Sequence, residues 1–192
     1  MFNFFKTTFF FYNISWYLKK SKLKNIKLIA MDIDGVLTNG SILLNQSGEN
    51  IRSFNVHDGL GIKLLLEQNY KIAFISGGVS GSSYQRALAL GVKECFFEVK
   101  NKKETLKNIQ NKFNLNKDNT IFIGDDINDL VVKDIVSLFI SPSSSTEIVL
   151  SKADLILKKK GGKGAIREFA DNILRDKKIW KKIKKNGWIQ RN

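Results

Sequence analysis

Residues 26–40 read IKLIAMDIDGVLTNG, an apolar run that ends in two acidic residues and a glycine. The continuous apolar segment Ile26–Met31 is typical of a strand that is buried on both faces of a parallel sheet. Side chains alternate between the two faces of a strand, so Asp32 and Asp34 project in the same direction, and Gly35 lets the backbone turn behind them. The segment therefore predicts a buried strand that carries a pair of carboxylates to the edge of a sheet.

The rest of the chain alternates between strand and helix patterns. A hairpin is predicted from Ser41–Leu44 and Asn50–Asn55. Further strands are predicted at Lys71–Ile75, Cys95–Phe97, Thr120–Ile123, Ser137–Ile140 and Asp154–Leu157, and helices at Gly59–Gln68, Ser80–Leu90, Lys102–Phe113, Ile127–Lys133 and Gly164–Leu174. This alternation predicts an α/β fold: a three-layer, Rossmann-like parallel sheet with helices on both faces and a small β-hairpin insertion.

The 192 residues most simply encode one domain with extensions at both ends. We expect the domain at 23–175, an aromatic and basic N-terminal extension at 1–22, and a basic helix or tail at 176–192. The first 18 residues hold nine of the 21 aromatic residues but are too short and polar for a membrane span. Three interpretations of this extension remain: an interfacial membrane anchor, a packing arm for an oligomer, or a segment without a role.

The net charge of +14 lies at the ends of the chain. Residues 28–174 carry 18 Lys and Arg against 17 Asp and Glu, whereas eight basic residues stand at 175–191. A neutral domain offers no basic face, which argues against a nucleic-acid reader, and the basic ends are typical of solvated lysines or of contacts with anionic partners. Cys95 is the only cysteine, so an intrachain disulfide is excluded and a cytoplasmic location is expected.

Polar side chains gather where the predicted strands end. Carboxyl ends of parallel strands meet at one edge of the sheet, where ligands bind. Carboxylate oxygens at such an edge are the ligands that Mg²⁺ prefers, and the metal offsets repulsion between a carboxylate nucleophile and a phosphate. The sequence therefore predicts a magnesium-dependent phosphoryl-transfer site at this edge, built from Asp32, Asp34, Ser76-Gly77-Gly78, Lys102, Asp125, Asp126 and Asp129.

Several of these motifs, taken in order, resemble the haloacid dehalogenase superfamily. They are MDIDGVLTNG, SGG, VKNK and GDDIND. The strings FNVHDGLGIKLL, RALALGV and ADLILKKKGGKGAIREFADNIL are similar to its capless branch, typified by phosphatases of 3-deoxy-D-manno-octulosonate 8-phosphate and of sialic-acid-type sugar phosphates. The resemblance covers about 27–174. It implies a fold without a cap domain, a homotetramer that uses the hairpin, and a place in lipopolysaccharide biosynthesis.

The resemblance also implies a role for each site residue. Asp32 corresponds to the nucleophile and Asp34 to the general acid/base. The implied metal ligands are Asp32, Asp34 through its backbone carbonyl, and Asp125, with Asp126 or Asp129 assisting. Ser76 and Gly77 are expected to hold the phosphoryl group, and Lys102 to neutralise its charge, although Lys100 and Lys103 leave the register of that lysine open.

Two positions leave alternatives. The resembling octulosonate phosphatases carry an arginine where this chain has Gly78, so Arg86 is predicted to bind substrate instead, and His57 is either a further contact or an ordinary polar residue. Residues 161–164, GGKG, are either an anion-binding loop or a turn before the last helix. The expected substrate is octulosonate 8-phosphate or an acylneuraminate 9-phosphate; the alternatives are another small phosphate ester or a non-catalytic assembly or membrane-associated relative.

Overall fold

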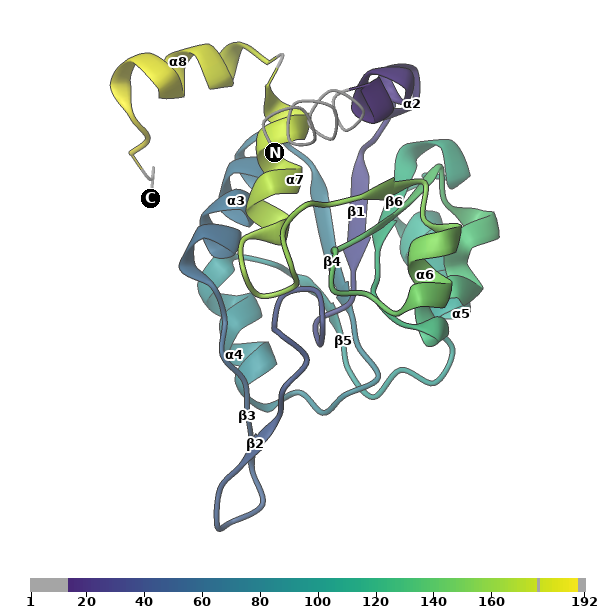
Figure 1. The fold of residues 1–192 in the computed structure, drawn as a ribbon, viewed down its shortest axis with the longest axis vertical. Helices are drawn as coiled ribbons and strands as arrows, with labels where there is room; N and C mark the ends of the chain where they lie inside the picture. The colour runs from purple at the N-terminus through teal and green to yellow at the C-terminus, as the bar shows by residue number, and fades with distance from the viewer. Residues whose placement is uncertain (1–13, 176, 190–192) are drawn as a thin grey trace, which may run out of the picture.

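The computed structural model describes residues 14–175 and 177–189 (Figure 1). Most of the aromatic N-terminal extension lies outside the described residues, so its three interpretations stay predictions. Within the part that is described, Trp16 is buried and its ring lies 6.2 Å from that of Phe169. The end of the extension thus packs onto the predicted domain.

Six strands form one parallel sheet in the order β5-β4-β1-β6-β7-β8. The central strand β1 pairs with β4 on one side and with β6 on the other, so the strand order reverses beside it. Ligand sites of open α/β sheets lie at such a switch point, beyond the carboxyl ends of the strands. The strands are β1 Leu28–Met31, β4 Lys71–Ile75, β5 Glu94–Phe96, β6 Thr120–Ile123, β7 Leu138–Ser141 and β8 Leu155–Ile156.

Helices cover both faces of the sheet, which confirms the predicted three-layer α/β fold (Figure 1). Alternate residues of β1 serve the two cores: Ile29 and Met31 face one layer, and Leu28 and Ala30 face the other. The first layer is α3 Val56–Glu67, α4 Gly81–Leu90 and α7 Ala165–Leu174, and the second is α5 Lys102–Lys112, η2 Ile127–Ile135 and α6 Glu147–Lys152. The segment η2, where a helix was expected, is a 3₁₀-helix, and α6 had no predicted counterpart.

The hairpin of β2 Leu43–Leu44 and β3 Asn50–Ile51 projects from the body of the molecule (Figure 1). Its strands are shorter than predicted. Leu43 and Leu44 are 62% and 69% exposed, which is unusual for neighbouring leucines. The described residues contain no cap domain, only this small insertion.

Short helical segments complete the chain. The basic segment after α7 was expected as a helix or tail. Lys177 in this segment is extended, and a separate helix follows it. Trp188 beyond that helix donates a hydrogen bond from Nε1 to Glu67 Oε2 at 2.9 Å. Among the described residues, no helix is long and apolar enough to cross a membrane. These segments are α2 Lys20–Lys24, η1 Lys117–Asn119 and α8 Lys178–Asn186.

Helix α3 begins three residues earlier than predicted, because Asn55 caps it by accepting hydrogen bonds from the backbone of His57 and Asp58. Asp58 therefore does not cap its own helix. Its buried carboxylate accepts from Gly164 N at 3.1 Å and from Arg167 N at 2.8 Å, at the start of α7. One side chain of α3 thus satisfies orphan donors of a helix more than a hundred residues away.

Candidate active site

Three carboxylates from different elements meet at the carboxyl end of the sheet. Asp32 follows β1 and donates its backbone N–H to Ile123 O of β6 at 3.0 Å. Asp125 follows β6, and Asp129 lies in the first turn of η2. One oxygen from each of the three lies within 4.8 Å of the others. The carboxyl ends of β1 and β6 therefore bring their acidic residues together, as the sequence predicts.

Lys102, at the start of α5, places its ammonium between two of these carboxylates. Its Nζ lies 2.6 Å from Asp129 Oδ1 and 3.0 Å from Asp32 Oδ1, and its side chain is 3% exposed. Its neighbour Lys103 instead pairs with Asp134 on the surface, and Lys100 is exposed. The geometry thus places Lys102, rather than either neighbour, at the carboxylates.

Asp129 is fully buried and organises the loop after β6. Its Oδ2 accepts from Asp125 N at 2.9 Å and from Asp126 N at 3.4 Å, while Oδ1 receives Lys102. Asp126 and Asp129 also form a reciprocal capping box at the start of η2. Asp129 therefore fixes both the backbone of Asp125 and the ammonium that faces Asp32.

The crowding of acids shifts their protonation. Burial, with repulsion from Asp129, raises the pKa of Asp32 to about 7 although Lys102 opposes the shift. Burial, with repulsion from Asp129 and Asp32, raises the pKa of Asp125 to about 8. Burial alone would lower the pKa of Lys102, but the charges of Asp32 and Asp129 raise it. Without a further cation the site therefore holds protons that isolated carboxylates would release at neutral pH.

The donor set fits a hard divalent cation. Asp125 Oδ1 is buried and accepts no hydrogen bond, and Asp32 Oδ1 has the Lys102 ammonium at 3.0 Å but no well-directed hydrogen bond. Buried polar atoms normally have partners, and oxygens lacking them next to a third carboxylate are suited to Mg²⁺. Asp32, Asp125 and Asp129 could thus hold a metal ion.

The carboxylate of Asp34 points elsewhere. Arg52, directly after β3, donates from Nε to Asp34 Oδ1 at 2.7 Å and from Nη2 to Asp34 Oδ2 at 3.0 Å. Thr38 Oγ1 adds a weaker contact at 3.4 Å. Arg52 was not among the site residues predicted from the sequence, because an arginine directly after a short hairpin strand belongs to none of the recognised motifs.

Ser76 follows β4 and is almost completely buried. Its Oγ accepts from Gly78 N at 3.0 Å, and the backbone of Val99 donates to its carbonyl. A side chain on Gly78 would lie within 3.4 Å of Ser76 Oγ and 3.1 Å of Asp34 Oδ2. The Ser76–Gly78 turn is thus brought beside Asp34, as the resemblance implied.

Arg86, the predicted substrate-binding arginine, contacts residues away from the clustered carboxylates. Its Nη2 donates to Asn55 O at 3.2 Å, and its guanidinium lies 5.9 Å from the Phe54 ring centroid. These contacts join α4 to the start of α3. His57 is exposed at the start of α3. The space beside Gly78 is occupied by Arg52, not by either of them.

The GGKG segment packs against the loop that follows Asp34. A Cβ on Gly161 would lie 1.7 Å from Gly35 O, so only glycine allows this approach. Every N–H of the segment is already used within the chain, which leaves no donors for an anion cradle. Gly161 N donates to Ser144 Oγ, Gly162 N to Val36 O, Lys163 N to Lys160 O and Gly164 N to Asp58 Oδ2.

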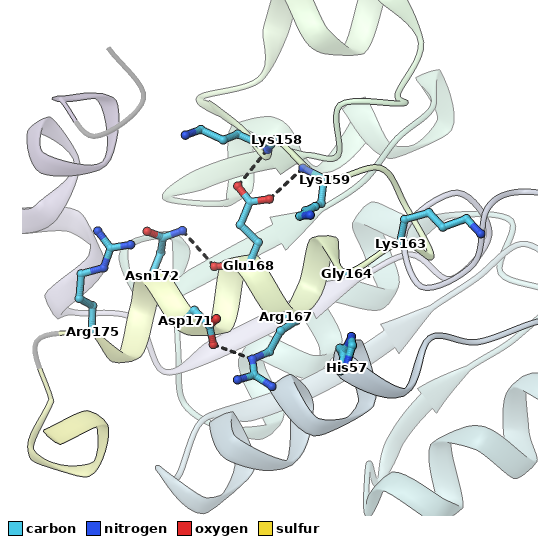
Figure 2. A pocket seen from close by; sticks show the side chains of 10 residues that line it. All are labelled: His57, Lys158, Lys159, Lys163, Gly164, Arg167, Glu168, Asp171, Asn172 and Arg175. Atoms are coloured by element: carbon cyan, nitrogen blue, oxygen red, sulfur yellow. Dashed lines mark hydrogen bonds and ion pairs between the residues drawn. The ribbon is translucent and has the colours of Figure 1, made fainter. Parts of the chain in front are cut away.

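A separate groove of about 580 Å³ runs along α7, with His57 at one side and lysines at the other (Figure 2). Glu168 spans its wall: Oε1 accepts from Lys158 N at 2.9 Å and Oε2 from Lys159 N at 2.8 Å (Figure 2). Glu168 thereby holds the segment before Gly161, which packs against the loop that follows Asp34. The groove contains none of the clustered carboxylates.

Comparison with known proteins agrees with this geometry. A family model described as haloacid dehalogenase-like hydrolase matches residues 91–169. A 3-deoxy-D-manno-octulosonate 8-phosphate phosphatase of Haemophilus influenzae is 36% identical over 155 residues, which cover 81% of this chain and 86% of that protein. The chain belongs to the haloacid dehalogenase-like hydrolases. The Salmonella typhi phosphatase of the same name is 32% identical, over 80% of this chain and 82% of its own length.

Solved structures of these hydrolases share the whole fold. The octulosonate 8-phosphate phosphatase of Moraxella catarrhalis, crystallised with a magnesium ion, a phosphate ion and a KDO molecule, superimposes with a TM-score of 0.84 at 31% identity, covering 92% of this chain and 99% of that one. The enzyme from Yersinia pestis gives 0.81 at 30% identity, covering 84% and 87%. The predicted family and capless fold are therefore confirmed.

Proposed function

We propose that the chain is a magnesium-dependent phosphatase that hydrolyses 3-deoxy-D-manno-octulosonate 8-phosphate. One observation carries the proposal: the Asp32 carboxylate faces the Lys102 ammonium within a cluster of acids at the switch point of the sheet. The named activity of the relatives, and the magnesium, phosphate and KDO bound by the Moraxella catarrhalis enzyme, support the choice of metal and substrate.

The proposed reaction has two steps. In the first, an Asp32 oxygen attacks phosphorus to form an aspartyl-phosphate, the bond from phosphorus to the sugar oxygen breaks, and Asp34 gives the leaving oxygen a proton. In the second, Asp34 takes a proton from water, the water oxygen attacks phosphorus, and inorganic phosphate leaves as Asp32 is regenerated. Lys102 and Ser76 would hold the phosphoryl oxygens during both steps.

Asp32 and Asp125 would hold the metal with their side chains and Asp34 with its backbone carbonyl, while Asp129 supports the site through Lys102 and the Asp125 backbone. A bound Mg²⁺ would supply positive charge that offsets the repulsion between a carboxylate and a phosphate dianion. The roles of Asp32, Asp34, Ser76 and Lys102 remain our assignments.

A panel of phosphate esters tests the proposal. Purified protein with magnesium should release phosphate from octulosonate 8-phosphate faster than from acylneuraminate 9-phosphate, a heptose phosphate or a nucleotide. Asp32→Asn should lower kcat by more than about 10⁴-fold, whereas Asp118→Asn, an exposed carboxylate on η1, should not change it. Acid quenching and borohydride reduction should convert a trapped aspartyl-phosphate to homoserine at position 32. If no ester releases phosphate, the enzymatic assignment is wrong. If acylneuraminate 9-phosphate is hydrolysed faster than octulosonate 8-phosphate, it becomes the assigned substrate instead.

A homotetramer, a cytoplasmic location and a place in lipopolysaccharide biosynthesis complete the proposal. Leu43 and Leu44 on the projecting hairpin favour a contact with another copy, because exposed apolar patches mark interaction sites. Sedimentation of the full chain tests the assembly: a monomer at all concentrations would remove it.

A further inference from the structure

Arg52 is buried to a degree that is rare for arginine. Its side chain is 1% exposed, and all three guanidinium nitrogens have hydrogen-bond partners. Nε and Nη2 donate to the two oxygens of Asp34, and Nη1 donates to Val79 O at 3.5 Å. A buried cation is costly unless it is paired and hydrogen-bonded. The guanidinium therefore has a defined place in the site rather than a solvated one.

The contact with Arg52 fixes the plane of the Asp34 carboxylate as well as neutralising its charge. Nε and Nη2 of Arg52 donate to the two oxygens of the same carboxylate, at 2.7 and 3.0 Å. Such a two-point contact holds a carboxylate in one orientation, which a single ammonium does not do. A carboxylate has about four lone-pair positions, and Asp34 remains 24% exposed, so a face stays open to a substrate.

Glycine at position 78 leaves the space that this guanidinium fills. A Cβ built there would lie 2.7 Å from Arg52 Nη2 and 3.1 Å from Asp34 Oδ2. Real Cβ atoms essentially never approach another heavy atom as closely as 2.7 Å, so even alanine would displace the end of the Arg52 side chain. Arg52 comes from the hairpin and Gly78 from the turn after β4, yet the two occupy one site.

We propose that Arg52 is a positioning residue for Asp34, and that Arg52 and Gly78 act as one unit. Arg52 holds the carboxylate in the orientation in which it exchanges protons with the leaving oxygen and with water. The proposal rests on the function assigned to Asp34 above.

Esters with different leaving groups test this role. An alkoxide leaves slowly without a proton, whereas p-nitrophenolate leaves without one. General acid catalysis is worth about 10²–10⁴-fold, so Arg52→Gln should lower the single-turnover rate of ester cleavage by about 10-fold or more on an alkyl phosphate and by less than about 3-fold on p-nitrophenyl phosphate. The single-turnover rate is compared because it does not include the later attack of water on the aspartyl-phosphate. KM should change little on either. Arg52→Lys, which cannot form the two-point contact, should give an intermediate kcat on the alkyl ester.

A mutant cycle tests the shared space. Gly78→Ala should lower kcat on the alkyl ester in the wild-type protein, but should have a smaller effect in an Arg52→Ala background, where the new Cβ no longer meets the guanidinium and only its contacts with Asp34 and Ser76 remain. Arg175→Gln, an exposed arginine at the end of α7, serves as the matched control and should leave kcat unchanged. Melting temperatures of all variants show whether a loss of rate is a loss of fold.

The outcomes separate this proposal from the function on which it rests. Equal losses on both esters would assign Arg52 a structural role, and a raised KM with unchanged kcat would make it a substrate contact; either result overturns the proposal, as does additivity in the cycle. If wild type cleaves neither ester, the assigned function fails. Crystal structures of wild type and Arg52→Gln then decide the positioning claim: it stands if the Asp34 carboxylate turns only in the variant, and falls if it does not.

Discussion

Removing magnesium should make the stability of this protein depend strongly on pH. The ordinary pKa of an aspartate is 3.8, whereas burial and the neighbouring acids raise the pKa of Asp32 to about 7 and the pKa of Asp125 to about 8. Between these values the folded chain binds protons that the unfolded chain has released, so stability falls as pH rises. The stabilising protons are fully present below about pH 4 and are lost as pH rises through about 7 to 8.

The expected size follows from these values. A pKa difference of one is worth about 1.4 kcal/mol, so Asp32 alone, raised from 3.8 to about 7, corresponds to roughly 4 kcal/mol at alkaline pH. Because Asp32 and Asp125 repel each other, their contributions overlap and do not add. In a domain of this size each kcal/mol moves the melting temperature by about 2–4 °C. Between about pH 5 and about pH 8, about two of the roughly three pH units contribute, or about 3 kcal/mol, which predicts a fall of roughly 6–12 °C from this source.

Thermal unfolding followed by circular dichroism, on protein stripped with a chelator, measures the effect at about pH 5 and about pH 8. Magnesium should raise the melting temperature much more at the higher pH, because it binds the ionised acids. Asp125→Asn should flatten the pH dependence of the stripped protein, whereas Asp118→Asn should preserve it. A metal-free melting temperature that is constant, or higher, at pH 8 would refute the account of a proton-loaded carboxylate cluster.

Two further substitutions test other contacts of the site. Lys102→Met should lower kcat by about 10²–10³-fold. It should also destabilise the fold by roughly 3–5 kcal/mol, because Asp129 is then buried without its cation. Lys103→Met removes only an exposed ion pair and should lower the free energy of unfolding by less than about 1 kcal/mol. Phosphate release and urea unfolding measure both, and an equal effect of the two would contradict the assignment of Lys102. Gly161→Ala should lower the melting temperature and phosphate release together, because its Cβ meets the Gly35 carbonyl; a variant as stable as wild type would contradict that packing.

Sequence patterns located the centre of the fold well. Continuous apolar runs predicted β4 and β6 with the bounds observed, because central parallel strands must be apolar on both faces. The ends of β1, β4 and β6 led directly to Asp32, Ser76 and Asp125. Features formed by residues adjacent in the sequence, such as a strand followed directly by a reactive side chain, were therefore predictable.

Contacts between distant segments were not predictable in the same way. Asp58 lies in the first turn of α3, but its carboxylate accepts hydrogen bonds from the N–H groups of Gly164 and Arg167, far along the chain. Arg52 reaches Asp34 only because the base of the hairpin lies beside residues 78–82. Neither contact leaves a periodic pattern, since each depends on how packed elements meet in three dimensions.

The projecting hairpin has a mechanical consequence for catalysis. A two-stranded ribbon has little stability of its own, yet the residue directly after its second strand, Arg52, grips the carboxylate that is proposed to move protons. Arg52 thus connects the projecting hairpin directly to the Asp34 carboxylate. Whatever steadies the outer leucines of the ribbon would also steady the reacting group at its base.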